Sequence, residues 1–288
     1  MLLSAEMRAR LERLALTSRG RIRANLGGRH GSRRKGESLD FADFRPYVPG
    51  DDFRRIDQHL YARLGQLVVR EYQAEDELTV RVVVDVSASM GLHGKSSLAG
   101  EIAGMITYLA LAGGDRVALY AIPGRERPLT IGPGGRHISV WPRLESWLEG
   151  LTTGGTMPMA TILRNLVGSA TTRGSTVIVS DMFDPEWERV LDGLGLGVGG
   201  IVFHVLGREE IDPDLFGDLR LLDVETGGEA MVSFSEEAGR LYREKLEGFV
   251  EGVAGRARRA GLDYLLVPTT DDALDRALAA LAGAGVVR

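Results

Sequence analysis

Three oxygen-bearing side chains follow a strongly apolar stretch in the first third of the chain. Residues 79 to 84 are mostly β-branched, which is typical of a strand buried in a parallel sheet, and Asp85, Ser87 and Ser89 come directly after it. Alternate residues can point the same way as an extended chain leaves a strand, so the three oxygens can converge on one small cation. Such a set suits Mg²⁺, which prefers oxygen ligands and keeps several waters, and is poorly suited to a soft metal.

By itself, the pattern of Asp85, Ser87 and Ser89 is also typical of a turn or a helix N-cap after a strand. Two later stretches of the sequence favour a metal site. Thr156 ends a glycine turn over residues 153 to 156, just before a predicted helix. Residues 175 to 180 form a second apolar strand that runs into Asp181. Because the carboxyl ends of parallel strands meet at one edge of a sheet, we expect a single Mg²⁺ site there, with Mn²⁺ or Ca²⁺ as alternatives. Its predicted ligands are Asp85, Ser87, Ser89, Thr156 and Asp181.

This set of residues resembles the metal-ion-dependent adhesion site of the von Willebrand factor A fold. The resemblance implies that the two serines and the threonine hold Mg²⁺ directly and that the two aspartates act mostly through water. It also implies that a carboxylate of a partner protein takes the last position on the ion. Two carboxylates neutralise a divalent cation and leave it able to attract a third anionic oxygen. The residues that we expect to contact the partner beside the ion are Met90, His93, Gly155 and Met182.

A second signature lies ahead of the Asp85 strand, in a segment rich in arginine and aspartate. Pro49-Gly50-Asp51-Asp52 predicts a turn, and Asp51 or Asp52 can cap a short helix over residues 53 to 62. Taken alone, the segment indicates a structural clamp. It is also similar to the signature of the bacterial family known as domain of unknown function fifty-eight, although Gln58 and His59 stand where that family usually has tryptophan and lysine. The matching positions are Arg45, Tyr47, Pro49, Gly50, Asp51, Asp52, Arg54 and Asp57. The resemblance implies that the partner is a MoxR-type AAA+ ATPase.

The composition of the chain excludes several classes of protein. The chain has 288 residues, of which 44% are hydrophobic and 26% charged, enough for one large α/β domain and an appendage. Cysteine is absent, which excludes disulfides and thiolate metal sites. No apolar run reaches the roughly 18 residues of a membrane span. The first residues lack the pattern of a secretory signal, so we expect a cytoplasmic protein.

Positive charge concentrates at the N-terminus. Residues 1 to 36 carry ten Lys and Arg against two Glu, whereas the whole chain has a net charge of −5. Such an arm could bind nucleic acid or an anionic lipid surface. No aromatic residue lies among these arginines to stack on bases, so docking on an acidic partner, or on the protein's own acidic domain, is the favoured interpretation and nucleic-acid binding is not expected.

Strands and helices alternate over residues 79 to 288. Strands are expected at 79–84, 116–122, 175–181, 201–206 and 264–267, with a short edge strand at 128–131, a hairpin at 219–234, and helices at 97–111, 137–151, 158–168, 186–194, 236–260 and 271–282. This alternation predicts an α/β fold with a doubly wound, mostly parallel sheet, of von Willebrand factor A or Rossmann type, behind an N-terminal extension of helix and irregular chain. The predicted parts are a basic helix and flexible loop over 1–36, the signature segment over 37–78 packed on the main domain, and the A-type domain over 79–288. His204, flanked by apolar residues, is expected to be buried and hydrogen-bonded.

Enzymatic alternatives match the sequence less well. The stretch from Ser89 to Ser96 ends in Gly94-Lys95-Ser96 like a phosphate-binding loop, but Ser89 stands where such a loop has its first glycine. Neither Gly-x-Ser-x-Gly nor His-Glu-x-x-His occurs. We therefore predict a non-enzymatic adaptor that binds a partner carboxylate through Mg²⁺. A nucleic-acid or anionic-surface module and a P-loop-like NTPase are the alternatives.

Overall fold

The computed structural model describes most of the chain as two compact units, residues 1–29 together with 78–288, and residues 30–77. The described residues are 1–18, 41–49, 51, 53, 56–72, 79–122, 130–154, 159–160, 163, 174–194 and 199–283.

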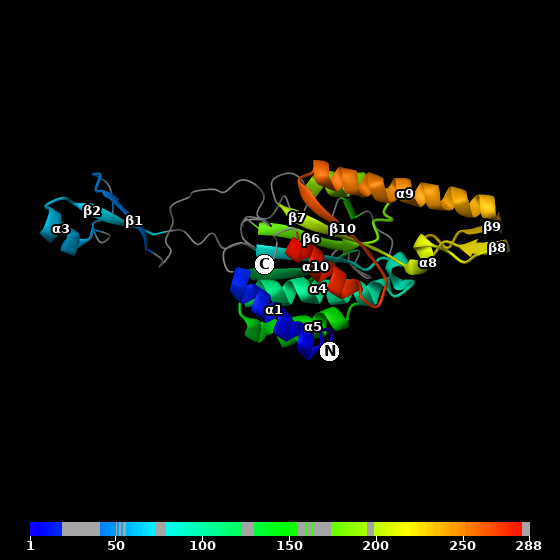
Figure 1. Cartoon of the computed structure of the whole chain (residues 1–288), viewed down its shortest axis with the longest axis horizontal. Coiled ribbons are helices and arrows are strands. Elements are labelled where there is room, and N and C mark those ends of the chain that lie inside the picture. The colour runs from blue at the N-terminus through cyan, green and yellow to red at the C-terminus, as the bar shows by residue number, and fades with distance from the viewer. Residues whose placement is uncertain are drawn as a thin grey trace. The chain divides into compact units, whose positions relative to one another are not determined.

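A six-stranded sheet forms the centre of the larger unit (Figure 1). Its strands are β3 (Thr79–Asp85), β4 (Arg116–Ile122), β5 (Thr130–Gly135), β6 (Gly174–Ser180), β7 (Gly200–Leu206) and β10 (Leu262–Pro268), in the spatial order β10-β7-β6-β3-β4-β5. All pairings are parallel except that of β5 with β4 at the edge. Strands β3, β6 and β7 are buried along their whole length, which explains their continuous apolar runs. The mostly parallel sheet predicted from the sequence is confirmed.

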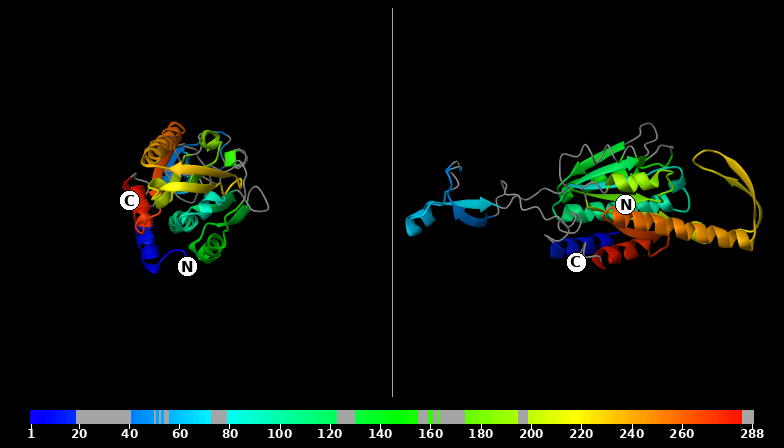
Figure 2. Two further views of the ribbon diagram at one scale, coloured as in Figure 1. Left: turned by 90° about the vertical axis from the view of Figure 1, so that its right-hand side faces the viewer. Right: turned by 90° about the horizontal axis from the view of Figure 1, so that it is seen from above.

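Helices cover both faces of this sheet (Figures 1 and 2). One face carries α1 (Ala5–Ser18), α4 (Lys95–Ala112), α5 (Trp141–Glu149) and α10 (Ala273–Gly283), and the other carries α7 (Trp187–Leu194) and α9 (Glu236–Arg259). Side chains alternate along a strand, so Val82 and Val84 enter the first core while Val83 enters the second. The doubly wound arrangement follows from this alternation. None of the described helices is long and apolar enough to cross a lipid bilayer.

Helix α1 belongs to the larger unit. Leu11 and Ala15 are fully buried in the core beside α4. On its polar side Arg10 forms an ion pair with Asp275 of α10, and Glu12 accepts a hydrogen bond from the Tyr108 hydroxyl. The sequence predicts residues 1–36 as a separate segment, but the apolar face of α1 finds its partner on α4 and joins the main core.

A two-stranded hairpin stands apart from the central sheet. Strands β8 (Gly217–Leu222) and β9 (Glu229–Phe234) pair in antiparallel fashion, as the sequence predicts, and β9 leads directly into α9. In Figure 2 the yellow hairpin lies beside the first turns of the orange helix. Both strands are largely exposed, so the hairpin adds little to either core.

The smaller unit contains β1 (Phe41–Pro46) paired antiparallel with β2 (Val68–Tyr72), and helix α3 (Gln58–Leu64). Asp57 caps α3, because its Oδ1 accepts hydrogen bonds from the backbone N–H groups of His59 and Leu60. The predicted cap at Asp51 or Asp52 is therefore wrong. The helix starts later than the sequence suggests.

Other signature residues organise turns. The Asp51 carboxylate accepts the Val48 N–H at 2.9 Å, and the Tyr47 N–H donates to the carbonyl of Leu67. Pro49 lies within the turn that Asp51 closes. The remaining members are Arg45, which lies in β1, and Gly50, Asp52 and Arg54, which lie outside the described residues. The packing of residues 37–78 on the main domain stays a prediction.

Candidate functional site

The two predicted aspartates lie on neighbouring strands at the carboxyl edge of the sheet. Asp85 is the last residue of β3, and Asp181 follows β6, which pairs directly with β3. Ser180 ties the strands together because its hydroxyl donates to Asp85 Oδ2 at 2.6 Å. Both carboxylates are buried, with exposures of 3% and 1%. The sheet topology therefore brings together two acidic groups that lie 96 positions apart in the printed sequence.

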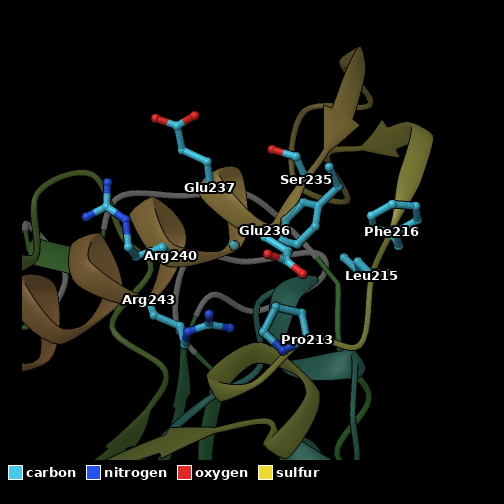
Figure 3. Close-up of a pocket in the computed structure, with 10 residues that line it drawn as sticks. Pro213, Leu215, Phe216, Ser235, Glu236, Glu237, Arg240 and Arg243 are labelled. Carbon is cyan, nitrogen blue, oxygen red and sulfur yellow. The ribbon is translucent and has the colours of Figure 1, made fainter.

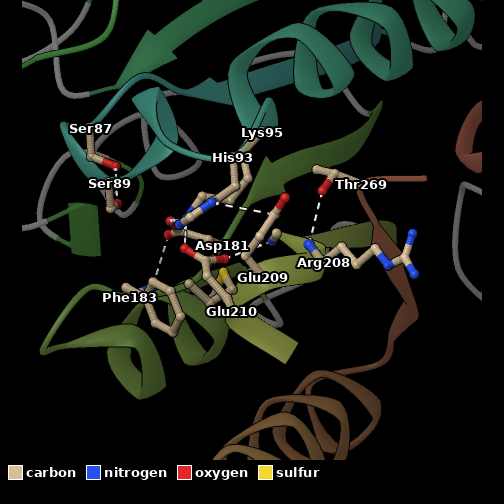
Figure 4. A network of polar contacts seen from close by, with 12 residues as sticks. Ser87, Ser89, His93, Lys95, Asp181, Phe183, Arg208, Glu209, Glu210 and Thr269 are labelled. Carbon is tan, nitrogen blue, oxygen red and sulfur yellow. Dashed lines mark hydrogen bonds and ion pairs between the residues drawn. The ribbon is translucent and has the colours of Figure 1, made fainter. Parts of the chain in front are cut away.

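The two predicted serines lie beside Asp85, in the turn that leads into the short 3-10 helix η2 (Ser89–Gly91). The Ser87 N–H donates to Asp85 Oδ1 at 2.8 Å, which fixes the direction of the turn. The hydroxyl oxygens of Ser87 and Ser89 are 3.1 Å apart (Figure 4). Their side chains converge as the alternation of the sequence predicts.

The glycine turn expected to supply a hydroxyl is described only as far as Gly154. Thr156 and Gly155 lie outside the described residues, so their predicted roles stay predictions. The Gly154 N–H donates to the carbonyl of Val86 at 2.8 Å. A Cβ atom at Gly91 would come within 2.8 Å of Thr153 Oγ1, so the described part of this turn packs against the serine segment. A side chain at position 91 would displace the Thr153 hydroxyl.

A buried lysine occupies the same edge of the sheet (Figure 4). Lys95 Nζ lies 2.7 Å from Asp181 Oδ2 and 2.5 Å from Glu210 Oε1, and its side chain is 0% exposed. The ammonium also lies 5.1 Å from the centre of the Phe183 ring, within the range of a cation–π contact. A buried charge is tolerated only when it is paired and hydrogen-bonded, and Lys95 meets that condition twice.

Glu210 is held in place from two sides. Its Oε2 accepts the Gly207 N–H at 2.7 Å, and its backbone carbonyl accepts the Tyr242 hydroxyl of α9 at 2.6 Å. Sequence reasoning missed this residue and considered Lys95 only as part of a phosphate-binding loop. The available signal was a lone lysine at the start of an apolar helix, directly behind the serine turn.

His204 supports the Asp181 backbone from β7, as a buried and hydrogen-bonded histidine. Its Nε2 donates to the carbonyl of Asp181 at 2.9 Å, and its Nδ1 lies 2.7 Å from the Tyr264 hydroxyl. A carbonyl can only accept, so the proton resides on Nε2 and Nδ1 accepts from the tyrosine. Burial lowers the pKa of His204 to about 4. The imidazole is therefore neutral at pH 7.

Asp85 is the carboxyl group of this cluster whose pKa is most strongly shifted. Burial, together with the nearby Asp181 carboxylate, raises the pKa of Asp85 to about 7, and the hydrogen bonds from Ser180 and Ser87 only partly oppose this. Among the described residues no ion pair reaches the Asp85 carboxylate, whereas Asp181 is paired with Lys95. The cluster therefore has acceptor capacity and negative charge that a cation would stabilise.

The chemistry of these donors fits Mg²⁺. They are hydroxyl and carboxylate oxygens, the ligands of a hard cation. In the described part of the chain, no group of three or more His, Asp or Glu residues could hold a metal. An ion here would therefore depend on the hydroxyls of Ser87 and Ser89.

Two of the predicted partner contacts are corrected by the structure. Met90 and Met182 are 0% and 1% exposed and pack in the two hydrophobic cores, so their side chains cannot contact a partner. His93 is partly exposed, and its Nδ1 lies 3.4 Å from Glu209 Oε2. Both His93 and Met182 have positive φ, +53° and +57°, so a strained backbone flanks the cluster on two sides.

A shallow pocket lies between the hairpin and the start of α9 (Figure 3). Phe216 and Leu215 line one side, and Arg240 and Arg243 the other. None of the predicted metal ligands lines it.

The fold and this cluster define a class of protein, a doubly wound α/β domain with hydroxyl and carboxylate groups gathered at the carboxyl edge of its parallel sheet. Within that class the chain belongs to the family described as "Protein of unknown function DUF58", whose model matches residues 43–248. The family membership predicted from the Arg45 to Asp57 signature is confirmed.

Two mycobacterial proteins and two solved structures are similar to this chain. The uncharacterized proteins Rv1480 of Mycobacterium tuberculosis and Mb1516 of Mycobacterium bovis are each 30% identical to this chain over 228 residues, covering 77% of this chain and 72% of theirs. Among solved structures, the conserved hypothetical protein BatB from Bacteroides thetaiotaomicron has a TM-score of 0.45 at 12% identity, covering 72% of this chain and 98% of that one. An aerotolerance-related membrane protein from Bacteroides fragilis has a TM-score of 0.40 at 13% identity, with the same coverage.

Proposed function

We propose that this protein is a non-enzymatic adaptor that binds a carboxylate of another protein through a Mg²⁺ ion held at the carboxyl edge of its sheet. Asp85, Ser87, Ser89 and Asp181, with Thr156, would hold the ion. The partner proposed from the family resemblance is a MoxR-type AAA+ ATPase. The observation that supports the proposal best is the convergence of the two serine hydroxyls beside two buried carboxylates.

Different residues orient the two carboxylates of this site. Ser180 and the Ser87 N–H orient the Asp85 carboxylate, while Lys95 and the Phe183 N–H orient that of Asp181. The hydroxyl oxygens of Ser87 and Ser89 lie 3.1 Å apart, and the Ser87 hydroxyl also donates to the Asp85 carboxylate. A hydroxyl that donates keeps its lone pairs for an ion. When bound, Mg²⁺ would supply the positive charge that attracts a carboxylate oxygen from outside.

The alternatives have less support. Lys95 would have to leave the carboxylates of Asp181 and Glu210, which it contacts at 2.7 and 2.5 Å, before it could meet a phosphate, which weighs against a phosphate-binding loop. Arg10 is already paired with Asp275, so this part of the basic arm is engaged with the protein's own domain.

Isothermal titration calorimetry with Mn²⁺ and Mg²⁺ tests the metal site. The wild type should bind one ion, and Ser89→Ala should weaken the affinity more than about tenfold, because it removes a ligand oxygen. Ser97→Ala, at an exposed serine on α4, is the matched control and should bind as the wild type does. Asp85→Asn should abolish binding but leave the fold intact, since it removes one of two clustered like charges.

Binding to the ATPase tests the adaptor role. The affinity for a MoxR-type ATPase from the same genome should fall more than about tenfold when EDTA replaces Mg²⁺, because the ion would bridge the two chains. Equal affinity in EDTA and in Mg²⁺ would overturn the bridging mechanism.

A further inference from the structure

The tip of the β8–β9 hairpin delivers a carboxylate to the serine turn. Glu225 Oε1 accepts the backbone N–H of Ser89 at 2.8 Å, across 136 positions of sequence. Within the tip, residues 223–228, Glu225 is partly buried while its neighbours are exposed. This hydrogen bond links an otherwise exposed hairpin to the candidate metal site.

The tip is built to hold Glu225 in this position. The Asp223 carboxylate accepts the Thr226 hydroxyl and the N–H groups of Glu225 and Thr226, which lowers the pKa of Asp223. The Asp223 backbone closes the turn, since its N–H donates to Gly228 and its carbonyl accepts from Gly227, both at 2.8 Å. These bonds fix the turn through local contacts, so Glu225 is pre-positioned before it meets Ser89.

The carboxylates at this edge outnumber the positive charges that pair with them among the described residues. Lys95 pairs with the carboxylates of Asp181 and Glu210. The carboxylates of Asp85 and Glu225 accept hydrogen bonds at the same edge, from Ser180 and from the Ser89 N–H, but form no described ion pair. A further carboxylate placed beside buried acidic groups is unfavourable unless positive charge compensates for it. Glu225 nevertheless reaches the serine turn, at the backbone of the residue whose hydroxyl lies 3.1 Å from that of Ser87.

We infer that Glu225 is an internal carboxylate ligand of the site and occupies the position that the proposed function gives to a partner's carboxylate. This inference depends on that proposed function. A tethered group competes at a high effective concentration, so the hairpin tip must leave before an external carboxylate can bind. The β8–β9 hairpin would then act as a cap that the partner displaces.

Chemical rescue tests this role with Mn²⁺ and acetate as probes on the full chain. Glu225→Ala removes the carboxylate and leaves space, so its Mn²⁺ affinity should fall more than about tenfold in calorimetry and should be restored by acetate. Acetate should leave the wild-type affinity unchanged. Glu229→Ala is the matched control, because Glu229 lies in the same hairpin but pairs with Arg220, and it should bind Mn²⁺ as the wild type does.

Hydrogen exchange followed by mass spectrometry gives a second, independent result. Mg²⁺ should slow exchange of the hairpin amides, residues 219–234, in the wild type and in Glu229→Ala, but not in Glu225→Ala. The inference is wrong, and the proposed metal site survives, if two results are found together. Glu225→Ala binds the ion as tightly as the wild type does, and Mg²⁺ leaves the exchange of the hairpin amides unchanged. If the wild type binds neither Mg²⁺ nor Mn²⁺, both are wrong.

Discussion

Replacement of Lys95 by methionine should cost this protein far more stability than the loss of an ordinary ion pair. Methionine has a similar length and no charge, so Lys95→Met leaves the Asp181 and Glu210 carboxylates without their ammonium. These side chains are only 1% and 13% exposed, so water cannot replace the lost partner. Removing one partner of a buried pair costs about 3–5 kcal/mol of unfolding free energy.

An exposed ion pair in the same chain provides the control. Arg256 and Asp192 form a two-pronged pair whose side chains are 32% and 52% exposed. Arg256→Met should cost far less than Lys95→Met, because solvent screens exposed pairs and solvates the partner that remains. The comparison isolates burial, since both substitutions remove one positive charge and insert the same side chain.

Urea unfolding in EDTA, followed by circular dichroism, measures both losses. The expected difference between the two variants is at least about 2 kcal/mol at equal m-values. If Lys95→Met is too unstable to purify, the double variant Lys95→Met/Asp181→Asn replaces it; because it leaves one fewer unpaired carboxylate in the buried cluster, it should be purifiable where the single variant is not. A loss for Lys95→Met as small as that for Arg256→Met would refute the buried-pair reasoning.

Two further perturbations test the electrostatics and the packing of the sheet. In EDTA, Asp85 and His204 should make stability depend on pH in opposite directions. The folded chain keeps a proton on Asp85 between pH 3.8 and about 7 that the unfolded chain has lost, so this group's contribution falls as pH rises. His204 titrates at 6.5 when unfolded and about 4 when folded, so its contribution is lost as pH falls through that window. Asp85→Asn keeps only the His204 contribution, so it should be more stable at pH 7.5 than at pH 5 by roughly 2 kcal/mol. His204→Gln should show the reverse trend in urea unfolding, and identical pH profiles in the two variants would contradict the assignment. In β6, Gly174→Ala places a Cβ 2.0 Å from the carbonyl oxygen of Thr79 on β3 and should cost about 2 kcal/mol or more, while Gly248→Ala, in open space on α9, should gain about 0.5 kcal/mol. Equal melting temperatures of these two glycine variants would argue against the close approach.

The sheet and its oxygen-rich edge were predictable because their signals are local. Runs of β-branched residues mark β3 and β6, and the residues that end such strands must lie at one edge once the sheet is parallel. Asp85 and Asp181 meet for that reason, and Ser87 and Ser89 follow from the alternation of the chain.

The partners of Lys95 could not be predicted in this way. Its ion pair with Glu210 joins residues separated by 115 positions, and nothing near Glu210 distinguishes it from a surface glutamate. The contact of Glu225 with Ser89 is equally non-local, because it depends on how far the hairpin reaches. The same limit explains the error at Met90, since a methionine beside a polar turn can point outward or into the core, and only tertiary packing decides.

Helix α9 connects the β8–β9 hairpin to the core of the larger unit. Its 24 residues correspond to a length of about 36 Å. Val253, Ala254 and Ala257 are buried near its C-terminal end, whereas Gly239 and the Tyr242 hydroxyl, which donates to Glu210, fix the end that carries the hairpin. An added or deleted residue between these parts would turn everything before it by about 100° around the helix axis. The rotation of α9 about its axis thus determines where the hairpin places Glu225. The number of residues in this helix therefore matters to the site as much as any side chain within it.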